Sequence, residues 1–265
     1  MDEHEPEEPV LYEVKDKIAT ITLNRPHRLN AMNVAMVDRL PEVFRQFDRD
    51  DDAHIAILKG NGKSFCAGGD LKEMSASGAK HIFEETKNLA VVRYPSATYQ
   101  FESKKPIIGA IQGYALAGGF TLSLACDVRI AAEDAKFGIS EVKVGRGAPW
   151  AVPLLWAVPS GIAMELLMRG NQMTAQRAYE VGYVNQVVAR DELCDTVWAI
   201  AEEIRDNAPV TVRAHKRLLY RAMDAGRALG YLLADELAEA IYTSEDCQEG
   251  QRAFREGRKP NFTGR

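Results

Sequence analysis

The chain of 265 residues has few cysteines and no excess of basic side chains. The cysteines are far apart and in no paired spacing, at Cys66, Cys126, Cys194 and Cys247. This distribution argues against a disulfide framework and favours reduced thiols in a cytoplasmic protein. Because the chain carries no net positive charge, its composition gives no electrostatic support for nucleic-acid binding.

The sequence also lacks a secretory signal and a hydrophobic run long enough to cross a membrane. Its most apolar stretch, residues 148–158, contains Pro149 and Pro153 and is much shorter than the roughly 20 residues of a membrane helix. We therefore expect no membrane association. His54 and His215 are isolated in the sequence, with no metal-ligand spacing, so we expect no metal site.

The net charge of −5 arises at the N-terminus. Five of the first ten residues are acidic and none is lysine or arginine, whereas the rest of the chain holds 33 acidic and 33 basic side chains. A start rich in proline and glutamate is typical of disorder. We therefore expect residues 1–9 to be a disordered acidic leader before a neutral folded body.

Short β-rich runs alternate with turns and helical patterns over the first two thirds of the chain. Strands are expected at residues 10–14, 18–23, 55–58, 107–111 and 128–131, the first two as a hairpin. Asn33 is the expected N-cap of a helix whose apolar side chains recur at helical spacing up to Phe47, although Pro41 interrupts the pattern. This alternation predicts an α/β fold.

The last third is mostly helical. Helices are expected at residues 174–182 and 189–206, from Pro209 onward, and at residues 229–244. Their apolar faces need a partner to cover them. We therefore divide the folded body into a core at residues 10–200 and a helical region at residues 201–265.

Two segments each combine an extended run with small residues, at positions 64–70 and 113–119. Small residues let backbone N–H groups approach a ligand closely, and a helix beginning at Gly118 would direct its positive end to the same point. One N–H from each segment would then form an oxyanion hole. The alternative is two tight turns that merely need glycine. Cys66 has no nearby histidine partner and is expected to be a buried apolar side chain.

Further motifs accompany these two segments in a specific order and spacing. They lie at residues 24–31, 65–71, 105–116, 125–127, 137–141 and 254–262. With this ordered set, the chain resembles the enoyl-CoA hydratase/isomerase (crotonase) superfamily over roughly residues 10–265. The resemblance implies a crotonase-like spiral of ββα units, followed by helices that build a homotrimer or a hexamer of paired trimers.

The resemblance also implies an acyl-coenzyme A thioester as substrate, with coenzyme A as part of that substrate and no separate cofactor. By position, the N–H groups of Ala67 and Gly118 would hold the thioester oxygen and stabilise an enolate. The residues implied to line the substrate are Arg28, Leu29, Ala31, Gly68, Asp70, Leu71, Thr121, Trp150, Lys259 and Phe262. The last two would act in the same or a neighbouring subunit.

Hydratases of this family use two glutamates to activate water, and here Thr121 stands at the first position and Glu141 at the second. A threonine hydroxyl has no useful basicity near neutral pH, and Asp127 is expected to be structural. Apolar neighbours are expected to raise the pKa of Glu141. A single base favours isomerisation of 3-enoyl-CoA to 2-enoyl-CoA. Hydration, another enolate reaction such as hydrolysis or decarboxylation, and a catalytically weak acyl-CoA-binding paralogue remain alternatives.

Overall fold

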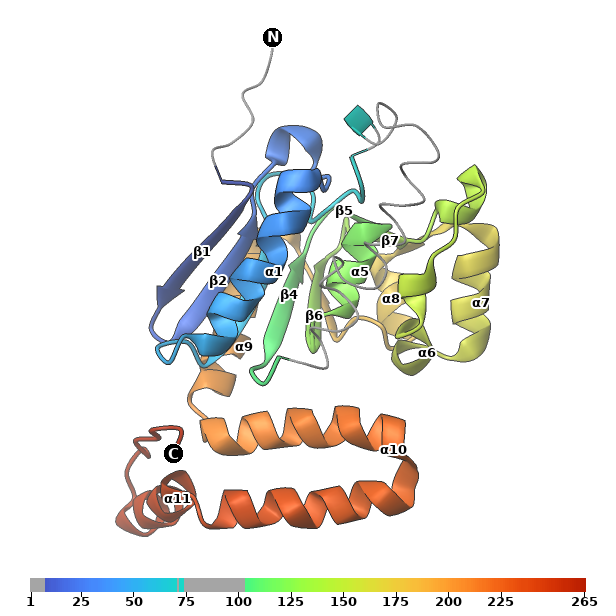
Figure 1. The fold of residues 1–265 in the computed structure, drawn as a ribbon. Helices are drawn as coiled ribbons and strands as arrows, with labels where there is room; N and C mark the ends of the chain where they lie inside the picture. Colours follow the sequence, from blue (N-terminus) through green and yellow to red (C-terminus); the bar gives the residue numbers. More distant parts are fainter. Residues whose placement is uncertain (1–7, 71, 74–102) are drawn as a thin grey trace.

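The computed structural model describes residues 8–70, 72–73 and 103–265. Its main sheet has six strands in the order β1-β2-β3-β4-β6-β9 (Figure 1). They are β1 (Val10–Lys15), β2 (Ile18–Leu23), β3 (Ile55–Gly60), β4 (Ile107–Ile111), β6 (Val128–Ala132) and β9 (Gln186–Val188). β1 and β2 are antiparallel and the other neighbours are parallel. The five strands expected from the sequence and the α/β class are confirmed.

The β1–β2 hairpin and the first long helix follow from local sequence signals. Asp16 and Lys17 both have positive φ angles, 49° and 62°, as the primed turn of a two-residue hairpin requires. The helix α1 (Val34–Arg49) begins where the Asn33 side chain accepts a hydrogen bond from the Met36 N–H at 3.0 Å. The expected interruption at Pro41 does not occur, because the helix continues through it with one apolar face buried on the sheet.

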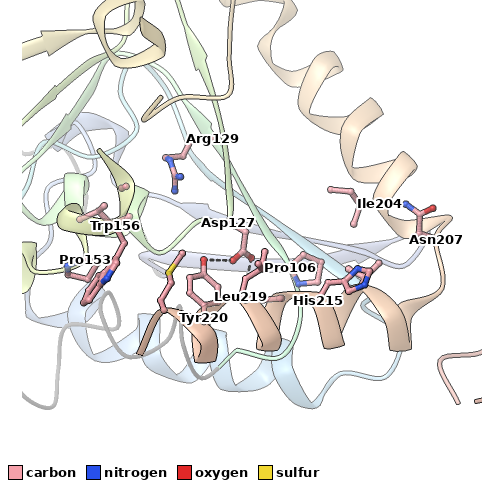
Figure 2. Close-up of a pocket in the computed structure, with 15 residues that line it drawn as sticks. Pro106, Asp127, Arg129, Pro153, Trp156, Ile204, Asn207, His215, Leu219 and Tyr220 are labelled. Atoms are coloured by element: carbon pink, nitrogen blue, oxygen red, sulfur yellow. Dashed lines mark hydrogen bonds and ion pairs between the residues drawn. The ribbon is translucent and has the colours of Figure 1, made fainter. Parts of the chain in front are cut away.

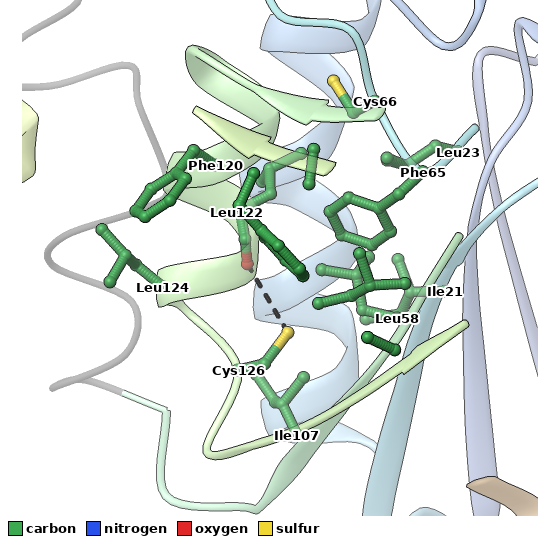
Figure 3. Close-up of a cluster of buried hydrophobic side chains, with 14 of the residues drawn as sticks. Ile21, Leu23, Leu58, Phe65, Cys66, Ile107, Phe120, Leu122, Leu124 and Cys126 are labelled. Carbon is green, nitrogen blue, oxygen red and sulfur yellow. Dashed lines mark hydrogen bonds between the residues drawn. The ribbon is translucent and has the colours of Figure 1, made fainter. Parts of the chain in front are cut away.

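Two hydrophobic clusters cover the two faces of the sheet. Ala56 and Leu58 face α1 and the short helix α5 (Gly118–Leu124), in the cluster that Figure 3 shows in part. Ile55 and Ile57 face the helix α9 (Leu193–Arg205). This alternation along β3 is the period of two that a strand buried on both faces requires.

A second, smaller sheet carries the parts of the chain on which the site depends. It consists of β5 (Tyr114–Leu116), β7 (Lys136–Gly138) and β8 (Gln172–Thr174), in that order. β5 and β7 are parallel, so their carboxyl ends lie at the same edge. The remaining short elements are η1 (Pro26–Arg28), η3 (Glu141–Val144), η4 (Pro149–Ala151), α6 (Leu154–Ala157), α7 (Ser160–Arg169), α8 (Ala175–Glu180) and η5 (Arg190–Glu192).

The C-terminal helices lie at the end of the molecule opposite the top of the sheet (Figure 1). α10 (Pro209–Tyr242) turns back at Gly226, whose φ of 72° and ψ of 172° are not helical, and α11 (Glu245–Glu256) follows. The Asp246 carboxylate accepts hydrogen bonds from the Thr263 and Gly264 N–H groups, which fastens the terminal segment to α11. Within the described residues, every helix is too short or too polar to cross a membrane.

A buried ionic cluster fastens α10 to the core. The Asp127 carboxylate accepts hydrogen bonds from the Ile107 N–H and the Lys216 ammonium, both at 2.8 Å, and from the Tyr220 hydroxyl at 2.7 Å. The Lys216 ammonium also donates to the Lys105 carbonyl at 2.9 Å. Both oxygens of Asp127 are therefore hydrogen-bonded within the fold, which agrees with the structural role expected from the sequence.

Replacing Asp127 by alanine should destabilise the fold by about 3–5 kcal/mol, because it leaves the buried Lys216 ammonium without its counter-ion. Urea denaturation measures this loss. The matched control is Glu165→Ala, which removes an exposed pair with Arg169 on α7 and should cost less than about 1 kcal/mol. Equal losses in the two variants would contradict a stabilising role for the Asp127 cluster.

Candidate active site

The two glycine-containing segments lie directly against each other. The Cys66 N–H donates to the Tyr114 carbonyl at 2.8 Å, and the Leu116 N–H donates to the Cys66 carbonyl at 3.0 Å. A Cβ atom added at Gly119 would lie 2.1 Å from the Cys66 carbonyl oxygen, a distance that no side chain tolerates. Glycine at position 119 is therefore required for the approach of the two segments.

The N–H of Ala67 does not face this junction. It donates to the Leu29 carbonyl at 3.0 Å, on the side of the chain opposite to Tyr114. Neighbouring N–H groups of extended chain point to opposite sides, and Cys66 already uses the side that faces β5. The expectation that Ala67 donates to the thioester oxygen is therefore corrected, because its N–H is bound within the protein.

The N–H of Gly69 has the orientation that Ala67 lacks. Gly69 forms a parallel bridge with Met32, in which the Met32 N–H donates to the Gly68 carbonyl at 2.7 Å and the Asp70 N–H donates to Met32 at 3.0 Å. Those two bonds face Met32, so the Gly69 N–H points the other way, toward residues 114–118. Among the described residues, no acceptor for this N–H is found.

The N–H of Gly118 is the second candidate donor to a bound oxygen, beside that of Gly69. It is the first residue of α5, and the first N–H groups of a helix have no acceptor within the helix. Ala117 precedes it with a φ of 50° and a ψ of −118°, a strained conformation for a residue with a side chain, and its N–H donates to the Gly138 carbonyl at 2.9 Å. A Cβ atom added at Gly68 would lie 3.7 Å from the Gly118 nitrogen, so the two segments meet at this point.

Glu141 reaches the same edge from β7. It begins η3, three residues after Gly138, and its Oε2 atom is buried without a hydrogen-bond partner among the described residues. Burial raises the pKa of this carboxyl, against smaller opposing effects from the Glu141 N–H, Arg146 and the Ser140 N–H. A buried carboxylate with an unpaired oxygen is costly to maintain, and such groups cluster at sites of proton transfer.

Thr121 lies one turn into α5 and is buried, with 1% of its surface exposed. Its hydroxyl donates to the Ala117 carbonyl at 3.2 Å, a bond within its own helix. Among the described residues, Glu141 is the carboxylate that follows β7, the strand that pairs with β5 just ahead of Gly118. Cys66 is fully buried, and burial raises the pKa of its thiol to about 12, so the expected apolar role is confirmed.

A buried arginine, Arg25, holds the loop of residues 25–32, although no sequence pattern singled it out. The Arg25 guanidinium pairs with Asp70 at 3.1 Å and donates to the Ala31 carbonyl. The backbone N–H of Arg25 donates a hydrogen bond to the Asn30 side-chain oxygen at 2.8 Å. The Asp70 carboxylate therefore pairs with Arg25 inside the protein. This ion pair, rather than a contact with substrate, explains its place in the motif.

The remaining predicted substrate residues lie in different parts of the chain. Arg28, Leu29 and Ala31 lie on the loop of residues 25–32, the Arg25 loop. It borders the contact between residues 66–69 and 114–119, the glycine junction, and Arg28 is exposed. Trp150 is buried in the main hydrophobic cluster on η4, and Leu71 lies outside the described residues. Lys259 and Phe262 follow α11 at the opposite end of the molecule, so the fold does not bring them to Glu141 within one chain (Figure 1).

A cavity of about 440 Å³ lies between α10 and the core, at the far end of α5 from Gly118. Figure 2 shows Trp156, Asp127, Tyr220 and Leu219 around it. Its carboxylate, Asp127, is fully hydrogen-bonded. Glu141 is absent from the lining of this cavity, which is therefore distinct from the Glu141 site.

Comparison with known proteins agrees with this geometry. A family model described as enoyl-CoA hydratase/isomerase matches residues 13–265. The chain belongs to the enoyl-CoA hydratase/isomerase family. A relative from Thauera aromatica, (E)-benzylidenesuccinyl-CoA hydratase, is 36% identical and aligns over 97% of this chain and 99% of its own length.

Solved structures of family members confirm the crotonase-like fold. An enoyl-CoA hydratase from Bacillus anthracis superposes with a TM-score of 0.92 at 30% identity, covering 97% of this chain and 100% of that one. One from Mycobacterium tuberculosis H37Rv superposes with a TM-score of 0.87 at 37% identity, covering 98% and 100%. The resemblance stated from the sequence is therefore confirmed.

Gly170→Ala should lower activity on the order of 10- to 100-fold by displacing the turn that carries Glu141. Gly170 has a φ of +60°, and an added Cβ would lie 2.8 Å from Val142 Cγ1 in η3. Gly182→Ala is the matched control, because Gly182 has a φ of +80° and no atom within 4 Å of the added Cβ. Both variants should lose about 1 kcal/mol of unfolding free energy, and only G170A should lose activity.

Proposed function

We propose that the protein is an enoyl-CoA hydratase that adds water across the double bond of a 2-enoyl-CoA thioester. The observation that carries this proposal is the Oε2 atom of Glu141, which is buried without a hydrogen-bond partner among the described residues, just after the strand β7 that pairs with β5 ahead of Gly118. The isomerase reaction favoured from the sequence has less support, since relatives at 36% and 30% identity are named as hydratases. Two of those names, benzylidenesuccinyl-CoA and 2,3-dehydroadipyl-CoA hydratase, refer to acyl groups of dicarboxylic acids.

One carboxylate is sufficient for this reaction if water and the added proton approach the same face of the double bond. Glu141 takes a proton from water as the water oxygen bonds to C3, and the π electrons move to the thioester oxygen. The N–H groups of Gly69 and Gly118 stabilise the resulting enolate, a contribution of about 3–4 kcal/mol per donor in comparable sites. Glu141 then returns its proton to C2. Its raised pKa makes it a stronger base than an ordinary carboxylate.

The coenzyme A part of the substrate is assigned to the Arg25 loop. Arg28, Leu29 and Ala31 lie beside the glycine junction, and the exposed Arg28 guanidinium is suited to a phosphate. No further cofactor takes part in this scheme, and the reduced cysteines suit a cytoplasmic location.

We assign the protein to a homotrimer or a hexamer of paired trimers. Large apolar side chains are exposed on α10, at Leu219 and Met223, and on α6 and α7, at Leu155 and Met168. Burying these surfaces against a second copy would remove them from water. Lys259 and Phe262 would then be available to the site of a neighbouring subunit. Sedimentation of the purified protein measures this state, and a monomer would contradict the assignment.

The proposal is tested with 2-enoyl-CoA and 3-enoyl-CoA thioesters assayed side by side. Hydration of the 2-enoyl substrate, followed by loss of its absorbance, should exceed isomerisation of the 3-enoyl substrate. Isomerisation without hydration would restore the reading favoured from the sequence. Turnover of neither substrate would leave the chain as an acyl-CoA-binding relative.

Glu141→Gln should reduce kcat by roughly 10²- to 10⁴-fold, because it removes the only proton carrier in the scheme. The acid limb of the wild-type kcat/KM profile should lie above the ordinary range of a glutamate and disappear in E141Q. An acid limb that is retained in E141Q would show that this ionisation belongs to another group.

The same variant has an opposite effect on stability. Since the pKa of Glu141 is raised in the fold, the folded chain binds more protons than the unfolded chain between the ordinary and the raised pKa. Wild-type stability therefore falls relative to E141Q as pH rises through this window, and E141Q should be the more stable protein at neutral pH. Urea denaturation across that pH range measures the difference.

A further inference from the structure

Three aromatic rings join the two elements that carry the reacting groups. Phe120 is in α5, two residues after Gly118. Phe137 is in β7, four residues before Glu141. The Tyr183 ring stacks on Phe120 at a centroid distance of 5.0 Å and meets Phe137 edge-on at 5.3 Å. Tyr183, from the loop between α8 and β9, therefore packs against both elements at once.

The Tyr183 hydroxyl adds a directional bond to this packing. It lies within hydrogen-bond distance of the Ser123 hydroxyl in α5. The Ser123 hydroxyl has one proton, which it donates to the Phe120 carbonyl at 2.7 Å, so the Tyr183 hydroxyl is the donor in the pair. Burial raises the pKa of Tyr183, which therefore keeps this proton. Ser123 and Tyr183 are fully buried, so water does not replace either partner.

Arg129 fastens Tyr183 to the end of α5. Its Nε donates to the Tyr183 carbonyl at 2.6 Å, and its guanidinium donates to the carbonyls of Ser123, at 3.3 Å, and Cys126. The same guanidinium lies over the Tyr183 ring, 5.0 Å from the ring centroid. The backbone, ring and hydroxyl of Tyr183 are thus all held against α5.

The packing of Tyr183 holds a strained turn at the start of α5. Ala117 has a φ of 50° and a ψ of −118°, a conformation that persists only where the surrounding structure over-determines it. The Ala117 N–H donates to the Gly138 carbonyl at the end of β7, at 2.9 Å. If α5 shifted against β7, this turn would relax and the Gly118 N–H would change direction.

We propose that Tyr183 is a positioning residue, which sets the direction of the Gly118 N–H relative to Glu141 by holding α5 against β7. The proposal rests on the function proposed above, in which the Gly118 N–H stabilises an enolate and Glu141 carries the proton. Tyr183 is fully buried and acts through Gly118, without contact with the substrate.

The test measures kcat and KM for Tyr183→Leu and Tyr183→Phe. The substrate is the enoyl-CoA thioester that the wild-type protein turns over, 2-enoyl or 3-enoyl, because both reactions use Gly118 and Glu141. Y183L loses the ring stack and the hydroxyl, so kcat and kcat/KM should fall by the same factor, on the order of 10- to 100-fold, with KM little changed. Y183F keeps the ring and should retain most of the activity.

A pair of variants tests the hydroxyl bond separately. Ser123→Ala leaves the buried Tyr183 hydroxyl without its acceptor, which is more costly than removing both partners. Adding Y183F to S123A should therefore raise kcat and thermal stability above those of S123A alone. A further fall in the double variant would overturn the role assigned to the hydroxyl.

The matched control is Phe47→Leu, which truncates another fully buried ring, on α1 and beside Lys105 at the start of β4. At a temperature where every variant is folded, F47L should keep the wild-type kcat. Wild-type kcat in Y183L, or an equal fall in F47L, would overturn the proposal and leave the hydratase function intact. Turnover of the 3-enoyl substrate alone would remove the hydratase function, and Tyr183 would then be judged by that turnover. Turnover of neither substrate would remove both.

Discussion

The contact between two stretches of backbone at Cys66 and Gly119 is the constraint on which the rest of the site depends. A single methyl group at position 119 would lie 2.1 Å from the Cys66 carbonyl oxygen, so this contact requires glycine at the second position of the helix α5. The contact aligns β5 with residues 66–69 and places the first N–H groups of α5 beside the Gly69 N–H. Preorganised donors of this kind need no rearrangement when charge develops on a bound oxygen.

The glycine junction depends on the elements around it for its place in the site. Arg25 and Asn30 hold the loop that fixes one side, and the parallel pairing of β5 with β7 delivers Glu141 from the other side. The cost is visible at Glu141 Oε2, which is buried without a partner among the described residues. The strained φ and ψ of Ala117 lie at the same point. Functional groups held in unfavourable states are maintained by the stability of the surrounding fold.

The sequence predicted most of this architecture, and its errors have identifiable causes. The strands, the Asn33 cap and the family motifs were recognisable because each depends on neighbouring residues. The three-residue strands β7 and β8 were missed, because segments of that length carry no period. Ala67 was predicted as the donor and Gly69 was missed, because the direction of an N–H depends on which segment the chain pairs with, and the bridge of Gly69 with Met32 joins residues far apart in sequence. Arg25 was overlooked because its burial is a tertiary property.

Cys66 has a consequence for chemical reactivity. Its thiol lies within the segment that forms the site, but burial raises its pKa to about 12 and leaves it protonated and shielded. Cys126 is shielded in the same way beneath the sheet, with its sulfur against the Leu122 carbonyl (Figure 3). Electrophiles and oxidants would therefore react first with the exposed Cys194 on α9, remote from the site. A covalent inhibitor directed at cysteine would label Cys194 without blocking the activity at Glu141. Oxidation of Cys194 would likewise leave that activity intact.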